Sequence, residues 1–158
     1  MAFGLNLYPI TYIARYNPDT KAWDEEWLEA DHVTFDELMA MNEDERKKIL
    51  DNRNQMGIPT VTYTSQYAYG CFEGMKGFPT KDGGVAIFRP DQNAARFANS
   101  MRGLYCPAFP EEQFVKASVE FVRRNAELGY VPKYNPDWEK TDYADAESIY
   151  MRPFMNSE

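Results

Sequence analysis

The chain has 158 residues, a formal net charge of −8 at pH 7 and an isoelectric point near 4.7. A chain of this length is typical of one domain, and we expect residues 1–158 to form it. The negative charge opposes binding to nucleic acid or to an anionic membrane, because such partners attract a positive surface. No apolar run reaches the roughly 18 residues of a membrane span, and Cys71 and Cys106 lack the spacing of a redox or metal pair. We therefore expect a cytoplasmic protein with reduced thiols.

The N-terminal third predicts a β-hairpin followed by a helix. Residues 7–23 carry apolar and aromatic residues on both sides of an Asn-Pro-Asp-Thr segment, which has the composition of a turn. Acidic residues crowd positions 24–31, where we expect solvated surface. Thr34 and Glu37 have the spacing of a capping box, so we expect a helix to begin there and to be interrupted near Asn42.

The middle of the chain predicts strands. Residues 60–69 are rich in β-branched and aromatic residues, which favours a strand. Residues 72–78 and 85–89 flank a Pro-Thr-Lys-Asp-Gly-Gly segment. We expect them to pair as a hairpin that turns at Asp82 and Gly83.

Two amphipathic helices and a last strand complete the chain. Pro90 and Pro110 begin the helices, and Gly129 is placed to end the second one. The stripes expected to face the core are Ala94, Phe97, Ala98, Met101 and Leu104 in the first helix, and Phe114, Val115, Ser118, Val119, Val122 and Ala126 in the second. Residues 148–154 predict a final strand. This order predicts an α+β fold with a mainly antiparallel sheet flanked by helices.

Three motifs follow one another in this sequence. Residues 67–78 read Y-A-Y-G-C-F-E-G-M-K-G-F, residues 87–97 read I-F-R-P-D-Q-N-A-A-R-F, and residues 150–153 read Y-M-R-P. In order and spacing they resemble the branched-chain aminotransferases, fold-type-IV enzymes that use pyridoxal 5′-phosphate (PLP). Phe3 belongs to a weaker match, and residues 25–54 show no resemblance. The resemblance implies the fold of the small N-terminal domain of these enzymes.

The resemblance also implies roles for single residues. It implies that Arg96 binds the phosphate of PLP, and a guanidinium group suits this role because it can donate two hydrogen bonds to a phosphate. It implies that the substrate pocket is lined by Phe3, Tyr67, Phe72, Gly74, Tyr150 and Arg152. Aromatic walls suit a branched aliphatic substrate, because burial of its apolar surface is favourable.

Each of these roles has a structural alternative. Arg96 is alternatively a solvated helix residue paired with a nearby acidic side chain. The aromatic residues are alternatively half-buried sheet residues, Arg152 a cation at the rim, and Gly74 a close-packing glycine. Glu73 and Lys76 can equally be a cross-strand pair on the solvent-exposed face, and neither is given a catalytic role.

The sequence lacks the reacting group of the resembled family. There, a lysine in a Gly-x-x-Lys-x-x-Gly-x-Tyr segment of the second domain holds the cofactor, and no lysine of this chain has that context. We therefore expect an N-terminal half that has no catalytic residue of its own, is inactive alone and binds PLP weakly. Its partner is then the missing C-terminal domain.

The activity implied for the complete enzyme is amino-group transfer between leucine, isoleucine or valine and 2-oxoglutarate, within branched-chain amino acid biosynthesis and in a homo-oligomer such as a dimer. One alternative is a non-catalytic binding domain that retains the fold. Another is a different fold-type-IV enzyme, such as a D-amino-acid aminotransferase or an aminodeoxychorismate lyase. Triad and metal chemistry are poorly supported, because the single histidine, His32, is expected to be solvated and has no neighbouring nucleophile motif or His/Cys cluster.

Overall fold

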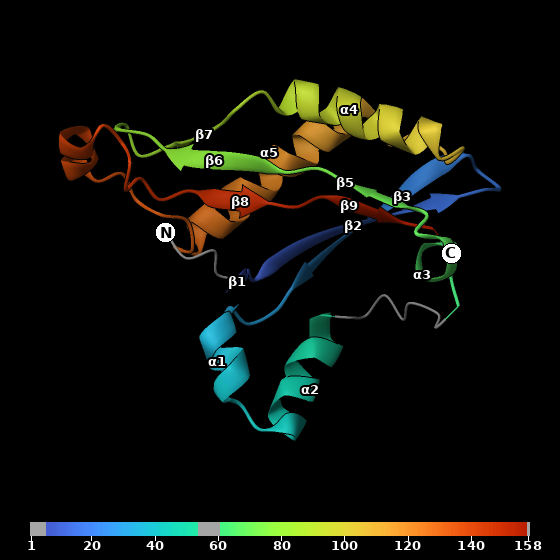
Figure 1. Ribbon diagram of the computed structural model, residues 1–158, viewed down its shortest axis with the longest axis horizontal. Coiled ribbons are helices and arrows are strands. Elements are labelled where there is room, and N and C mark those ends of the chain that lie inside the picture. Colours follow the sequence, from blue (N-terminus) through green and yellow to red (C-terminus); the bar gives the residue numbers. More distant parts are fainter. Residues whose placement is uncertain (1–5, 54–60, 158) are drawn as a thin grey trace. The chain divides into compact units, whose positions relative to one another are not determined.

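The computed structural model describes residues 6–53 and 61–157 (Figure 1). The chain divides into two compact units, Met1–Thr60 and Val61–Glu158. The described residues form helices and small antiparallel sheets, which confirms the α+β class. The single domain and the fold-type-IV architecture stay predictions.

In the first unit the described elements are β1 (Asn6–Leu7), β2 (Ile10–Asn17), β3 (Ala22–Glu29), β4 (Val33–Thr34), α1 (Phe35–Ala40) and α2 (Glu43–Arg53). β2 and β3 pair antiparallel, which confirms the expected hairpin. Its turn is held by Asn17, whose Oδ1 accepts hydrogen bonds from the backbone N–H groups of Asp19 (3.0 Å) and Thr20 (3.2 Å). The Asn-Pro-Asp-Thr segment therefore predicted the position of this turn correctly.

The second strand of the hairpin is longer than expected, because β3 continues through the acidic segment to Glu29. Cross-strand ring pairs hold it to β2: Tyr12 lies 4.8 Å from Trp27, and Tyr16 lies 5.5 Å from Trp23, between ring centroids. Three consecutive acidic residues lie between these tryptophans along β3. Aromatic pairing across the ladder thus outweighs the low strand propensity of the acids.

Two capping boxes explain the interrupted helix. Thr34 Oγ1 accepts from the backbone N–H of Glu37 (3.2 Å), and the Glu37 carboxylate accepts from the backbone N–H of Thr34 (2.8 Å). Asn42 and Glu45 exchange the same two bonds, at 2.9 and 3.2 Å. A new helix therefore begins at α2, which confirms the break near Asn42.

In the second unit the described elements are α3 (Tyr63–Tyr67), β5 (Gly70–Phe72), β6 (Met75–Pro79), β7 (Val85–Ile87), α4 (Pro90–Gly103), α5 (Glu111–Glu127), the 3-10 helix η1 (Pro136–Thr141), β8 (Ile149–Met151) and β9 (Phe154–Asn156). β6 pairs antiparallel with β7 and β8, and β5 pairs antiparallel with β9. The β6–β7 hairpin is confirmed. Gly83 in its turn has φ +85°, a backbone conformation that favours glycine.

The strand expected over residues 60–69 is wrong. Residue 60 lies outside the described residues, and α3 occupies the centre of the segment. Thr62 and Ser65 form a capping box in which each side-chain oxygen accepts from the other's backbone N–H, both at 2.9 Å. This local pairing outweighs the β propensity of the segment. Ala68 then ends the helix in the left-handed conformation.

The core of the second unit lies where α4 packs against α5 and β5, and Figure 1 shows α4 running alongside the strands. Phe97 of α4 lies 5.4 Å from Phe114 of α5 between ring centroids. The strands contribute Met75, Ile149 and Met151, all buried. The apolar stripe expected for α4 is confirmed, because Ala94, Phe97, Ala98 and Met101 are buried. Leu104, the last residue of the expected stripe, is half-buried.

The stripe expected in α5 is only partly correct, because Val119 and Ala126 are exposed and Asn125 is fully buried. The buried Asn125 side chain donates from Nδ2 to the backbone carbonyl of Phe121 at 2.9 Å. A polar residue can occupy this core position because the helix itself satisfies its amide. Gly129 has φ +82° just beyond the helix, which confirms it as the C-terminal cap.

The last strand expected is instead two strands, β8 and β9, separated at Arg152 and Pro153. Proline lacks the N–H that a ladder requires, so the chain leaves β6 at this point and pairs next with β5.

Within residues 6–53 and 61–157, no helix is both long enough and apolar enough to cross a membrane.

Candidate functional site

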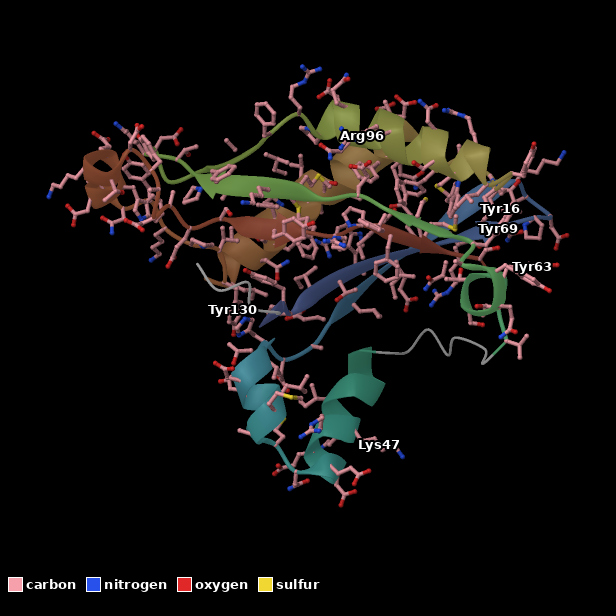
Figure 2. The ribbon with its side chains drawn as sticks, in the orientation of Figure 1. Tyr16, Lys47, Tyr63, Tyr69, Arg96 and Tyr130 are labelled. Carbon is pink, nitrogen blue, oxygen red and sulfur yellow. The ribbon has the colours of Figure 1, made fainter. Side chains whose placement is uncertain are left out.

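Arg96 and Glu73 form the centre of the candidate site, and Figure 2 labels Arg96 on α4. Arg96 donates from Nε to Glu73 Oε1 at 3.0 Å and from Nη2 to Glu73 Oε2 at 2.7 Å. The Glu73 side chain is 7% exposed, whereas the Arg96 side chain is 64% exposed. A carboxylate on the loop between β5 and β6 therefore fixes one edge of an accessible guanidinium group.

The Glu73 carboxylate has a second side-chain partner on α4. Asn93, which is buried, donates from Nδ2 to Glu73 Oε2 at 2.8 Å and to the backbone carbonyl of Gly74 at 3.2 Å. The backbone N–H of Glu73 donates to the carbonyl of Pro153 at 2.9 Å. The loop, α4 and the junction between β8 and β9 thus meet at this residue.

Ionised Glu73 is the favoured form in this environment. Burial raises the pKa of its carboxyl group, but hydrogen bonds from Arg96 and Asn93, the charge of Arg96 and a backbone bond at Gly74 together lower it further, so that the pKa lies below its ordinary value of 4.5. Glu73 is therefore negatively charged at neutral pH.

A second cluster is built around Arg152. Its guanidinium carbon lies 4.6 Å from the ring centroid of Phe72 and 5.2 Å from that of Tyr150. Its Nε and Nη2 atoms both donate to the Tyr150 hydroxyl, at 3.0 and 2.7 Å. A Cβ atom at Gly74 would come closer to that hydroxyl than van der Waals contact permits. Glycine at position 74 thus makes room for the Tyr150 hydroxyl.

The structure therefore brings together most of the residues proposed from the sequence, and leaves two apart. Phe72, Gly74, Tyr150 and Arg152 form the second cluster. Arg96 binds Glu73, which stands between Phe72 and Gly74 in the sequence. Tyr67 is 73% exposed on α3, where its ring lies 6.4 Å from that of Tyr63. Phe3 lies outside the described residues.

The Glu73–Lys76 pair considered for the solvent-exposed face is wrong. Glu73 is buried and bound to Arg96, and Lys76 lies opposite Tyr150 in the β6–β8 register. Glu73 follows the same alternation as the buried residues Met75 and Gly77, so it lies on the face opposite Lys76. The signal that sequence reasoning missed is the pair of polar residues Asn93 and Arg96, spaced three apart on one side of a helix.

The structure offers little support for a site built on histidine, cysteine or a metal ion. His32 is half-buried rather than solvated, and its ring packs edge-on against Tyr8 at 5.8 Å. Cys71 and Cys106 are half-buried free thiols, and burial raises the pKa of Cys71. In the part of the chain that the structure describes, no group of His, Cys, Asp and Glu side chains is arranged to hold a metal ion.

Comparison with known proteins supports the resemblance. No family model matches the sequence. A probable branched-chain-amino-acid aminotransferase of Streptomyces coelicolor is 35% identical over 100 residues, which are 63% of this chain and 25% of that relative. A branched-chain-amino-acid aminotransferase of Haemophilus influenzae is 37% identical over 89 residues, 56% of this chain and 23% of the relative. Transaminase htyB of Aspergillus rugulosus is 42% identical over 93 residues, 59% of this chain and 22% of the relative.

The matched segment thus spans about a quarter of the length of these relatives. The resemblance drawn from the three sequence motifs is confirmed by the comparisons. Over more than half of its length, the chain is similar to a part of the branched-chain-amino-acid aminotransferases.

Proposed function

We propose that this chain is the N-terminal part of a PLP-dependent branched-chain aminotransferase, and that it supplies phosphate and substrate contacts. The complete enzyme transfers an amino group between leucine, isoleucine or valine and 2-oxoglutarate. The similarity to aminotransferases supports the reaction class, amino-group transfer. The single observation that carries the site is Arg96, which is fixed along one edge by Glu73 and is 64% exposed.

The residues present suit a phosphate monoester. A guanidinium group that uses Nε and one Nη2 hydrogen for a carboxylate still has its other edge for an anion. PLP, when bound, supplies an electron sink for bond changes at the substrate's α-carbon. Arg96 binds the phosphate, and the rest of the protein supplies the lysine that holds the cofactor. By this account the chain is inactive alone and binds PLP weakly.

The Arg152 cluster supplies substrate contacts in this proposal. The rings of Phe72 and Tyr150 offer apolar surface against which a branched aliphatic side chain is buried. Arg152, stacked between them, orders the two rings and offers its remaining N–H groups to a carboxylate. The substrate classes are accordingly amino acids and 2-oxo acids.

Association between chains is part of the same proposal. Phe72 and Phe154 lie opposite each other in the β5–β9 register, and their side chains are 64% and 61% exposed. Adjacent exposed aromatic residues favour a protein partner, either the rest of the protein or a second copy in a homo-oligomer. A cytoplasmic location, expected from the sequence, completes the proposal.

A transaminase with another amino donor is the second candidate. The identity with transaminase htyB, 42% over 93 residues, exceeds the 35% found for the Streptomyces coelicolor relative. The name of that relative gives the reaction class without an amino donor, so the match supports transamination and leaves the donor open.

The test is an amino-donor panel with 2-oxoglutarate as acceptor. This chain is produced together with the remainder of its coding region, and each donor's conversion is followed as glutamate formation. We expect leucine, isoleucine and valine to be the preferred donors. Preference for another L-amino acid selects the second candidate, whereas turnover of D-amino acids, or of none, contradicts the proposal.

A further inference from the structure

The hydrogen bonds of Arg96 determine which of its donors can meet a ligand. A guanidinium group carries five N–H donors. The bonds to Glu73 use the one on Nε and one on Nη2. The second N–H of Nη2 and the neighbouring N–H of Nη1 form the remaining fork, which can make a two-point contact with a phosphate. Glu73 therefore decides the direction in which this fork points.

Glu73 is itself held in place. Its carboxylate is 7% exposed and also accepts from the buried Asn93 at 2.8 Å, and its backbone N–H donates to Pro153 at 2.9 Å. A buried glutamate that is held by Asn93 at its carboxylate and by Pro153 at its backbone cannot follow the mobile side chain of an arginine. Arg96 instead adopts the direction that Glu73 imposes.

Glu73 acts on a bound phosphate in two opposing ways. Its negative charge repels the anion, which weakens binding. Its two hydrogen bonds keep Arg96 in a single orientation, which strengthens binding because less side-chain freedom is lost when the anion arrives. The two effects have opposite signs, so the change in affinity after Glu73 is neutralised shows which one dominates.

We propose that Glu73, supported by Asn93, is a positioning residue that orients Arg96 toward a phosphate monoester. The inference rests on the proposed phosphate role of Arg96. Glu73 itself does not touch the ligand.

The experiment uses the whole chain, labelled with ¹⁵N, and follows by NMR the backbone amide signals of α4 in every variant, together with the Nε–Hε signal of Arg96 where the arginine is present. The probe is pyridoxine 5′-phosphate, which carries the phosphate but no aldehyde that would react with surface lysines. Pyridoxine without the phosphate is the ligand control. The variants are Glu73→Gln, Arg96→Lys and the double variant.

Glu112→Gln is the matched protein control. Glu112 pairs with Lys116 on an exposed face of α5, so this variant changes the net charge by the same amount without touching the site. Gln at position 73 replaces one carboxylate oxygen by an NH2 donor, so the two parallel bonds from Arg96 to Oε1 and Oε2 cannot both form and Arg96 loses its fixed direction.

If Glu73 positions Arg96, Glu73→Gln weakens binding of pyridoxine 5′-phosphate by roughly tenfold, the scale expected for a lost charge-assisted contact. Glu112→Gln and the affinity for pyridoxine change little. In the Arg96→Lys background, Glu73→Gln then causes no further loss, because it acts through Arg96.

Equal or tighter binding by Glu73→Gln would overturn the inference and leave the phosphate role of Arg96 intact. No response of the wild-type signal up to about 10 mM probe, a very weak affinity, would overturn the phosphate role together with the inference.

If Glu73→Gln does not fold, hydrogen exchange of the wild-type Nε–Hε group decides. We expect slower exchange at Arg96 than at Arg15, which binds Glu26 through Nη1, and exchange as fast as at Arg15 contradicts the inference.

Discussion

Gly74 lies so close to the hydroxyl of Tyr150 that the smallest side chain added at position 74 would overlap it. That hydroxyl is also the acceptor for two hydrogen bonds from Arg152. A change at Gly74 is therefore transmitted directly to the guanidinium group of Arg152.

We predict that Gly74→Ala lowers the free energy of unfolding by about 1–3 kcal/mol, the usual cost of forcing an extra methyl group into an occupied space. Urea denaturation measures it. Gly103→Ala is the control, because a Cβ atom there meets nothing within 4 Å at the end of α4. The control should be neutral or stabilising, and an equal loss in both variants would show that Tyr150 is not the cause.

Ala68 ends α3 with φ 55° and ψ 32°, a left-handed conformation that a Cβ atom disfavours. We predict that Ala68→Gly raises the free energy of unfolding by about 0.5–1 kcal/mol, because Ala68 is exposed and loses no buried contact. Ala126→Gly, the same change at an exposed helical position of α5, should lower it by a similar amount. Destabilisation by both substitutions would contradict the assigned backbone conformation.

The pH dependence of stability should carry a contribution from Glu73. Its pKa in the folded chain lies below the ordinary 4.5, so ionised Glu73 stabilises the fold fully above about pH 4.5, and this contribution is lost as the pH falls through the folded-state pKa. We predict that the difference in unfolding free energy between the wild type and Glu73→Gln is constant near neutrality and shrinks below about pH 4.5. Chemical denaturation at several pH values measures the difference, and a value that stays constant down to pH 3 would contradict the prediction.

The buried partner of Arg96 changes what its removal should do. The sequence alone predicts that Arg96→Ala leaves folding nearly intact. The structure predicts instead a clear decrease in the thermal unfolding midpoint, because Glu73 keeps its burial and loses two of its hydrogen bonds. Arg15→Ala removes an exposed pair with Glu26 and should lower the midpoint less. Equal midpoints for the two variants would restore the expectation from the sequence.

The sequence predicted those parts of the fold that local chemistry determines. The turn at Asn17, the capping box at Thr34 and the cap at Gly129 depend on neighbouring residues, and all three are confirmed. α3 was missed because the Thr62–Ser65 capping box competes with a segment of high strand propensity.

The candidate site shows the same boundary between local and distant effects. The motifs located Phe72, Tyr150 and Arg152, which the structure brings together. The Glu73–Arg96 pair joins residues 23 positions apart, and its geometry depends on the packing of α4 against the β5–β6 loop. A pattern of residue types along the chain holds no information about that distance, so the pairing of Glu73 with Arg96 was not predicted.

The most direct test of the central claim is PLP binding by the protein produced with the remainder of its coding region, in wild-type form and as Arg96→Lys. The visible absorbance of PLP reports the dissociation constant. Lysine keeps the charge and cannot bind Glu73 and a phosphate through two separate edges. We predict an affinity lower by roughly ten- to a hundred-fold in the variant, as expected for a lost charge-assisted two-point contact. Equal dissociation constants for the two proteins would contradict the account.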